Sequence, residues 1–145
     1  MWHQTDIRLR PRARGFHLVT DEIVAALPAL RGIETGLLHL FLQHTSAALT
    51  INENADPTVR KDFERWFDQA VPDGAPYFRH VDEGAEDMPA HIKSSLLSCE
   101  LHVPIGHGRL RLGTWQGIYL CEHRDEASAR HIVATIQGKP IAAAG

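Results

Sequence analysis

The most restrictive feature of the sequence is a pair of apolar segments separated by three polar residues. From Gly36 to Gln43, leucines at every second position occupy one face of an expected strand, and leucine, histidine and phenylalanine occupy the other. Because successive side chains of a strand point to opposite faces, this segment is predicted to be a central strand covered on both faces. Residues 47–52 also alternate and are predicted to form a second strand beside it.

Three helices are expected around these strands. Asp56-Pro57 is the strongest helix start, because aspartate can cap a helix and proline already has the φ angle of its first residue. Apolar residues at helical spacing then continue to near Val71. A short helix is expected from Thr20, as its N-cap, to a point before Gly32, and a third helix is expected to open at Pro89.

The last third of the chain indicates β-structure. Alternating apolar residues between Leu101 and Ile136 are separated by turn signals, which predicts consecutive hairpins. Strands mixed with helices and followed by hairpins favour an α+β fold with antiparallel pairing. No repeat or linker divides the sequence, so residues 1–145 are predicted to form a single domain.

Composition argues against several classes of protein. Lysine and arginine total 15 against 18 aspartate and glutamate, and the net charge of −3 argues against wrapping a nucleic-acid backbone, although a small local anion site stays open. No apolar run approaches the roughly 20 residues needed to cross a bilayer, and no signal-peptide pattern opens the chain, so we expect a cytoplasmic protein without membrane contact. Cys99 and Cys121 form no CxxC motif and are expected to be buried.

Two polar stretches occur where structure alone does not require them. His44, Thr45 and Ser46 supply an imidazole, two hydroxyls and backbone amides at a strand end, which suits a phosphate group but also an ordinary hairpin turn. Residues 52–56 place amide and carboxylate side chains, Asn54 among them, directly before the main helix start. This segment can hold an anion or a divalent cation, or can serve only to form a turn and cap the helix.

The ten histidines of the sequence raise the prospect of metal or proton chemistry. His80 precedes an acidic loop that ends at Asp87, and His91 follows on the third expected helix. Imidazoles together with a carboxylate are a usual ligand set for zinc, although this spacing matches no local signature such as HExxH. Lys93 and Ser95, close to His91, can instead contribute to a phosphate site.

The segment 113–117 is a different kind of signal, because a glycine at each end lets the backbone approach a neighbour closely. Gln116 in this segment can reach a ligand or only its own sheet, and Glu122 lies either at a site mouth or at a solvated strand end. The sequence contains no GxGxxG, Walker A or GxSxG motif and no Cys–His nucleophile pair. Dinucleotide redox chemistry, hydrolysis by a P-loop and serine hydrolysis are therefore disfavoured.

Taken together, these stretches make the sequence resemble the YjbQ-like family, which is associated with a secondary thiamine-phosphate synthase activity. The match runs nearly from end to end, and its motifs are specific in combination although each is weak alone. The segments that carry it are residues 43–46 (QHTS), 52–57 (NENADP), 77–80 (YFRH), 87–97 and 112–125.

The resemblance implies two packed, mainly antiparallel β-sheets flanked by about three helices, assembled as a homotrimer. It also implies that the polar segments gather in one pocket near a subunit interface, able to hold a metal ion or a phosphate-like anion. The leading hypothesis is an enzyme that joins a hydroxymethylpyrimidine diphosphate to a thiazole phosphate and releases pyrophosphate. A non-catalytic protein that binds a metal or a small phosphorylated metabolite, and a metal-dependent hydrolase, are the alternatives.

On this hypothesis, the departing pyrophosphate needs cations and hydrogen-bond donors around its oxygens. A divalent ion, zinc or magnesium, is expected, and a carboxylate completes its shell or orients a histidine. The expected metal ligands are His44, His80 and His91; the expected catalytic residues are Lys93, Asp87 and Glu122; and the expected substrate-binding residues are Thr45, Ser46, Asn54, Ser95 and Gln116.

Overall fold

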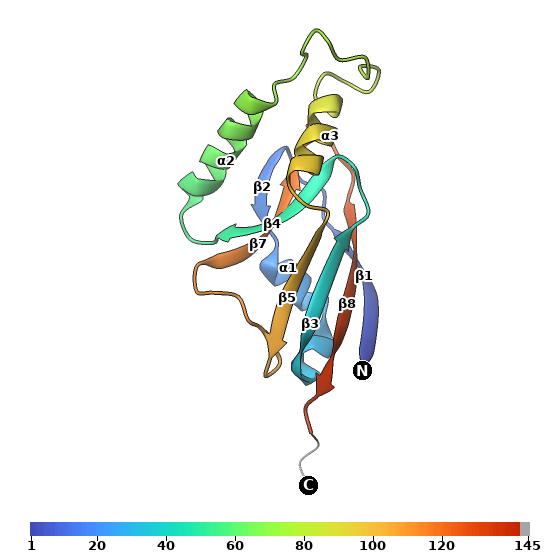
Figure 1. Cartoon of the computed structure of the whole chain (residues 1–145), viewed down its shortest axis with the longest axis vertical. Helices are drawn as coiled ribbons and strands as arrows, with labels where there is room; N and C mark the ends of the chain where they lie inside the picture. Colours follow the sequence, from blue (N-terminus) through green and yellow to red (C-terminus); the bar gives the residue numbers. More distant parts are fainter. Residues whose placement is uncertain (143–145) are drawn as a thin grey trace.

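A computed structural model describes residues 1–142 of the chain (Figure 1). Eight strands and three α-helices follow one another, with one 3-10 helix (η1) between α1 and β3. In chain order the elements are β1 (Trp2–Leu9), β2 (Gly15–Leu18), α1 (Thr20–Ala25), η1 (Pro28–Gly32), β3 (Ile33–Leu42), β4 (Ala47–Glu53), α2 (Pro57–Ala70), α3 (Asp87–Leu96), β5 (Glu100–Gly106), β6 (Arg109–Leu110), β7 (Gln116–Glu122) and β8 (Arg130–Pro140).

The strands form two sheets, one with the order β1-β8-β3-β5-β6 and one with the order β2-β7-β4. Every strand pair in residues 1–142 is antiparallel, so the predicted α+β fold with two mainly antiparallel sheets and three helices is confirmed. Two predicted pairings are wrong. β4 does not lie beside β3 in one sheet but pairs with β7, and β7 and β8 form no hairpin, because β8 pairs with β1 and β3.

The larger apolar core contains side chains from both sheets and from α1. Leu38, Leu40 and Leu42 on one face of β3 are buried in it, as the alternation predicts. β3 lies in the middle of its sheet, but Leu37 and Phe41 on its other face are exposed, so the expectation of cover on both faces is wrong for the single chain. The helices that would provide that cover lie on the smaller sheet instead.

Helices α2 and α3 contact the three-stranded sheet at β2 and β4 (Figure 1). Phe63 and Phe67 of α2 pack against a second apolar cluster that includes Phe16, Tyr119 and Cys121. β7, the middle strand of this sheet, is therefore the strand that is buried on both faces. Cys121 is buried as expected, whereas Cys99 is exposed.

The helix starts follow local capping chemistry to different degrees. Asp56 caps α2 as predicted, because its carboxylate accepts a hydrogen bond from the Thr58 backbone N–H at 2.9 Å. Thr20 does not cap α1, since its hydroxyl oxygen accepts the Ile118 N–H of β7 at 2.9 Å. α3 begins at Asp87, two residues before Pro89, because a proline in the first helical turn costs no intrahelical hydrogen bond.

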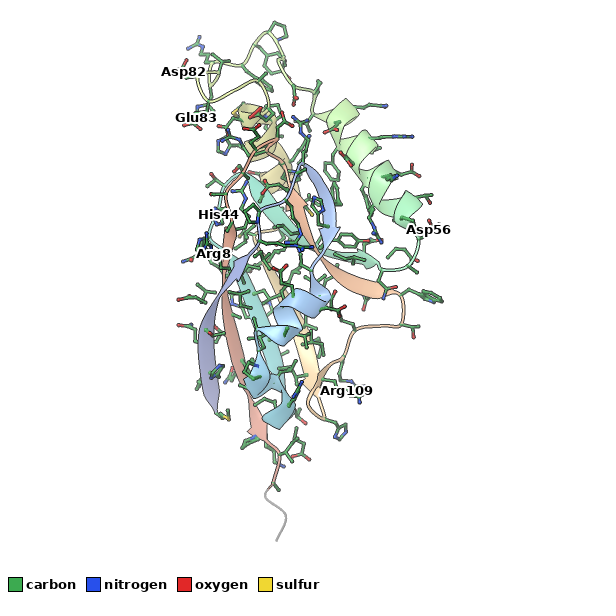
Figure 2. All side chains as sticks on the ribbon, turned by 180° about the vertical axis from the view of Figure 1, so that it is seen from behind. Arg8, His44, Asp56, Asp82, Glu83 and Arg109 are labelled. Atoms are coloured by element: carbon green, nitrogen blue, oxygen red, sulfur yellow. The ribbon has the colours of Figure 1, made fainter. Side chains whose placement is uncertain are left out.

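The molecule is elongated. The loop that carries Asp82 and Glu83 lies at one end, near α3, and Arg109, the first residue of β6, lies toward the other (Figure 2). Among residues 1–142, no helix has the length and apolar character needed to span a membrane.

Candidate functional site

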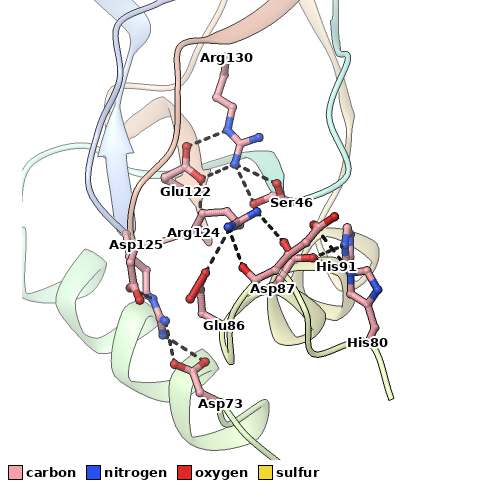
Figure 3. A network of polar contacts seen from close by, with 12 residues as sticks. Ser46, Asp73, His80, Glu86, Asp87, His91, Glu122, Arg124, Asp125 and Arg130 are labelled. Carbon is pink, nitrogen blue, oxygen red and sulfur yellow. Dashed lines mark hydrogen bonds and ion pairs between the residues drawn. The ribbon is translucent and has the colours of Figure 1, made fainter. Parts of the chain in front are cut away.

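The candidate site lies where α3 begins, at the end of the molecule that Figure 2 marks with Asp82 and Glu83. Asp87 is the first residue of α3, and His91 follows one helical turn later on the same face. His80 belongs to the loop that connects α2 and α3 and folds back over this face (Figure 3). The helix therefore fixes two of the three side chains, and the loop supplies the third.

The three side chains converge on one carboxylate oxygen. Nε2 of His80 lies 2.7 Å from Oδ2 of Asp87, and Nε2 of His91 lies 3.0 Å from the same atom. The two imidazole rings have centroids 5.3 Å apart. One nitrogen or oxygen atom from each residue lies within 4.8 Å of the others, so the group is compact enough to bind one metal ion.

The hydrogen bonding of His91 determines where its proton resides. Nδ1 of His91 lies 2.9 Å from the backbone carbonyl oxygen of Thr45, which can only accept a hydrogen bond, so Nδ1 carries a proton. In a neutral ring Nε2 then has a lone pair that points at the Asp87 carboxylate oxygen. A second ring proton makes this contact an ion pair, and a metal ion bound by both atoms would take the place of that proton. A backbone carbonyl behind a histidine is also the usual arrangement that orients a metal ligand.

Asp87 is buried and keeps its negative charge. Burial alone would raise the pKa of its carboxyl, but the hydrogen bond from His80 and the charges of His91 and Arg124 outweigh burial and hold that pKa below its usual value. Nη1 of Arg124 lies 2.9 Å from Oδ1 of Asp87, and Nε of Arg124 lies 3.3 Å from a Glu86 carboxylate oxygen. Oδ1 is thus taken by arginine, while Oδ2 faces the two histidines (Figure 3).

Arg124 contacts the candidate site and was not predicted from the sequence alone. It lies just after β7 and reaches across to the start of α3, so no feature of its immediate sequence reveals its partner. The available signal was its place in the segment 112–125, one of those that carry the family resemblance.

Two predicted catalytic residues are enclosed. Glu122 is buried, and its carboxylate receives Nε of Arg130 at 2.7 Å and Nη2 of Arg130 at 2.5 Å. The same Nη2 donates to the Ser46 hydroxyl at 3.0 Å, so Ser46 is buried with them. Lys93 is also buried, with Nζ 2.6 Å from Oδ1 of Asp68 on α2. None of these three side chains joins the His80–Asp87–His91 group.

His44 lies outside the group as well, although Thr45 next to it contacts His91. Nε2 of His44 accepts the His131 backbone N–H at 2.8 Å, and Nη1 of Arg130 lies 3.3 Å from its Nδ1. Burial, followed by the charges of Arg130 and His131, lowers the pKa of His44. The ring is therefore held neutral, with Nε2 already occupied by a backbone donor.

Thr45 and Ser95 lie at the edge of the site and are exposed, and the Ser95 hydroxyl donates to the His91 backbone oxygen at 3.0 Å. Asn54 and Gln116 lie elsewhere. The register pairs Glu53 with Gln116 at one end of β7 and Ala47 with Glu122 at the other, and a seven-residue strand spans about 20 Å. The predicted substrate-binding residues are therefore divided between two regions of the chain.

Asn54 and Gln116 line a cavity of about 760 Å³. The Asn54 amide donates to the backbone oxygens of Thr114 and Gln116, both at 3.1 Å, and the Gln116 side-chain oxygen accepts the Gly113 N–H at 2.8 Å. These bonds hold the loop before β7, at the cavity that Asn54 and Gln116 line.

The fold and the site define a class: an α+β protein of two antiparallel sheets with a histidine–aspartate group at the first turn of a helix. The chain belongs to the YjbQ-like family, because the family model described as UPF0047 protein YjbQ-like matches residues 5–139. The resemblance inferred from the sequence motifs is thereby confirmed as a family assignment.

Relatives from several organisms support this assignment. UPF0047 protein YjbQ of Salmonella typhimurium is 59% identical over 139 residues, which cover 96% of this chain and 100% of the relative. UPF0047 protein sll1880 of Synechocystis is 42% identical over 94% of this chain and 92% of its own length. The crystal structure of the conserved hypothetical protein TT1486 of Thermus thermophilus matches with a TM-score of 0.79 and 36% identity, covering 90% of this chain and 97% of that one.

Proposed function

We propose that the protein is a divalent-metal-dependent enzyme of the thiamine-phosphate synthase type, with His80, Asp87 and His91 as its metal ligands. The reaction joins a hydroxymethylpyrimidine diphosphate to a thiazole phosphate and releases pyrophosphate, as a secondary activity on substrates related to the physiological ones. The observation that carries the proposal is the convergence of two imidazole nitrogens and one carboxylate oxygen within 4.8 Å of one another, with Nδ1 of His91 held by the Thr45 carbonyl oxygen.

Zinc fits this ligand set better than magnesium. Imidazole nitrogens with one carboxylate are common zinc ligands, whereas magnesium prefers oxygen ligands and retains waters. Three protein ligands leave a further coordination position for a water or a substrate oxygen. A bound zinc ion would supply positive charge to the oxygens of a departing pyrophosphate.

The remaining roles follow from exposure and charge. The guanidinium nitrogens of Arg124 contact Asp87, Glu86 and the Glu83 backbone oxygen, so Arg124 positions the Asp87 carboxylate for the metal. Thr45 and Ser95 are exposed residues in contact with His91, and a phosphate group at the metal could exchange the Ser95 hydroxyl bond to the His91 backbone oxygen for one to its own oxygens. Lys93 and Glu122 make no contact with a substrate in this proposal, since Asp68 and Arg130 occupy their charged ends.

A turnover assay with the two thiamine precursors tests the proposal. Purified protein with bound zinc is expected to release pyrophosphate, and removal of the metal with a chelator is expected to stop the release until zinc is restored. His91→Ala is expected to abolish turnover, while the matched change at exposed His102 on β5 leaves it intact. Zinc-independent turnover, or full activity of His91→Ala, would contradict the proposal.

The same assay separates the alternatives. A histidine–histidine–aspartate group with an open coordination position also suits a hydrolase that uses a metal-activated water, so phosphate-ester and amide substrates belong in the panel. Zinc-dependent hydrolysis without pyrophosphate transfer would favour the hydrolase. Tight retention of a phosphorylated metabolite without turnover of any substrate would favour a binding protein.

We also propose that the protein is a homotrimer of the cytoplasm. Trp2, Leu37 and Phe41 on the outer face of the five-stranded sheet are large apolar side chains, and the register places Trp2 and Leu37 on either side of Gln137. An exposed apolar face of this kind supports contact with a second copy. Light scattering at micromolar concentration is expected to give about three times the 16.2 kDa mass of one chain, and a monomer would contradict the proposal.

A further inference from the structure

A second polar region lies between β2, the first half of α2 and the segment that links β1 to β2. It forms a groove of about 380 Å³, and the lining of this groove includes Phe16 and Leu18. We call it the cationic groove, because five of its lining side chains carry positive charge: Arg10, Arg12, Arg14, Arg60 and Lys61. The whole chain has a net charge of −3, so this local excess is not a consequence of composition.

Two of the five cations are neutralised by the protein itself. Arg12 lies 2.6 Å from a Glu22 carboxylate oxygen, and Arg14 lies 2.8 Å from carboxylate oxygens of both Asp73 and Asp125. Within residues 1–142, Arg10, Arg60 and Lys61 form no ion pair. Glu64 is the one acidic residue of the lining, so about two positive charges remain uncompensated.

Arg60 is the cation of the groove whose surroundings in the protein satisfy it least. Its Nε atom is buried, and it has no hydrogen-bond partner in the part of the chain that the structure describes. Its guanidinium lies 6.0 Å from the centre of the Tyr119 ring, which holds the group in place without accepting the Nε proton. Arg60 lines the groove and has neither an ion pair nor a side-chain hydrogen bond in residues 1–142, so its charge is available to an anion there.

We propose that the cationic groove binds the phosphate or diphosphate group of a small ligand. Such a group presents only acceptor oxygens and matches the planar fork of arginine. The groove adjoins the cavity of about 760 Å³ described above, and both are lined by Arg10, Arg12 and Leu18. That cavity, lined also by Asn54 and Gln116, has room for the organic part of the ligand.

The cationic groove is distinct from the candidate metal site. Neither its lining nor that of the adjoining cavity includes His80, Asp87 or His91. Its occupancy therefore does not depend on the proposed metal-dependent activity. A nucleic acid is a poorer fit, because Asp21, Glu22 and Glu64 line these same cavities and would repel an extended phosphate backbone.

Calorimetric titration with inorganic pyrophosphate, and separately with inorganic phosphate, tests the proposal. The full chain is first treated with a chelator and returned to low-salt buffer, so that no divalent ion can recruit the anion. Wild type is expected to bind pyrophosphate, and Arg60→Ala is expected to weaken binding at least about tenfold, since a charged hydrogen bond and an ion pair are lost together. Arg65→Ala, on the same helix but exposed and outside the groove, is expected to leave the affinity unchanged.

Two further variants keep the outcome decisive. Lys61→Ala tests the groove through an exposed residue if Arg60→Ala folds poorly, and it is expected to weaken binding several-fold. His91→Ala is expected to bind pyrophosphate as wild type does. The proposal is overturned if wild type binds neither anion at millimolar concentration, if Arg60→Ala and Arg65→Ala weaken binding equally, or if His91→Ala abolishes it.

Discussion

Two buried carboxylates lie near each other at one end of the three-stranded sheet, and they differ in how completely their partners satisfy them (Figure 3). Glu122 receives two nitrogens of Arg130, which also donates to Ser46, and the whole cluster is closed to solvent. Asp87 receives Arg124 on one oxygen, but its other oxygen faces two histidines whose side chains are 47% and 32% exposed. One cluster is closed and the other is open.

The difference separates a structural role from a chemical one. In the closed cluster each acceptor faces a donor and no position is left for a ligand. In the open cluster two partly exposed imidazole nitrogens converge on one carboxylate oxygen, a geometry that can bind a cation. Buried charge alone therefore does not mark a reactive site; an unsatisfied and accessible arrangement of charges does.

The largest expected effect is on the closed cluster. Glu122→Gln keeps the shape of the side chain and removes its charge, which leaves Arg130 as an uncompensated buried cation. We expect unfolding in urea to show a loss of about 3–5 kcal/mol, the usual consequence of breaking one side of a buried ion pair. Glu126→Gln, which changes an exposed glutamate nearby, is expected to cost less than about 0.5 kcal/mol. A stable Glu122→Gln protein that had lost only activity would assign Glu122 to the chemistry instead.

For the open cluster, the larger change in the free energy of unfolding is expected from adding zinc and not from shortening a side chain. Zinc at about one hundred times its dissociation constant should raise the free energy of unfolding of wild type by about 2.7 kcal/mol, because the folded state alone offers the assembled ligands. His91→Ala should lose most of this gain, while His102→Ala should keep it. If zinc stabilises His91→Ala as much as wild type, the ion binds elsewhere and the open cluster is no metal site.

A third prediction concerns how the stability of the protein depends on pH. His123 follows Glu122 in the chain and is buried. Burial, followed by the charges of Lys93 and Arg130, lowers the pKa of His123 to about 3. The unfolded chain therefore takes up a proton below about pH 6.5 that the folded chain refuses, so stability falls as pH falls. Between pH 7 and pH 5 the loss from this residue is about 2 kcal/mol.

Urea unfolding across this pH range measures that loss. His123→Gln should flatten the dependence between pH 7 and pH 5, whereas His102→Gln should not. Asp87 contributes in a different window, because its pKa lies below its usual value: its stabilisation is present above about pH 4 and fades only in stronger acid. A wild-type protein equally stable at pH 5 and pH 7 would contradict the burial of a neutral His123.

What the sequence predicted correctly depends on local chemistry. Asp56 and Pro57 start α2 because capping and the φ of proline act within a few residues. The leucine face of β3 is buried because alternation fixes which side chains share a face. His91 and Asp87 share a face because they are one helical turn apart.

What the sequence left undetermined depends on distant partners. Alternation identifies β4 as a strand but not the strand it pairs with, since either sheet buries its apolar face. His44 was grouped with His80 and His91 by residue type, yet its Nε2 is occupied by the His131 N–H, 87 residues away. The partner of Lys93 is Asp68 on another helix, and the partner of Asp87 is Arg124 beyond β7. Each of these contacts is created by the packing of distant elements against one another.

The smallest expected effect tests whether the closed cluster is independent of the open one. Ser46→Ala removes one of the acceptors of Arg130 Nη2, but the Ser46 backbone oxygen at 3.2 Å and the Glu122 carboxylate remain, so we expect a loss of only about 1 kcal/mol in urea unfolding. Ser95→Ala, which removes an exposed hydroxyl beside His91, is expected to change stability by less than about 0.5 kcal/mol. The comparison between the clusters predicts that the Ser46 change leaves zinc binding intact. A Ser46→Ala protein of normal stability and weakened zinc affinity would mean that the two carboxylates act as one site.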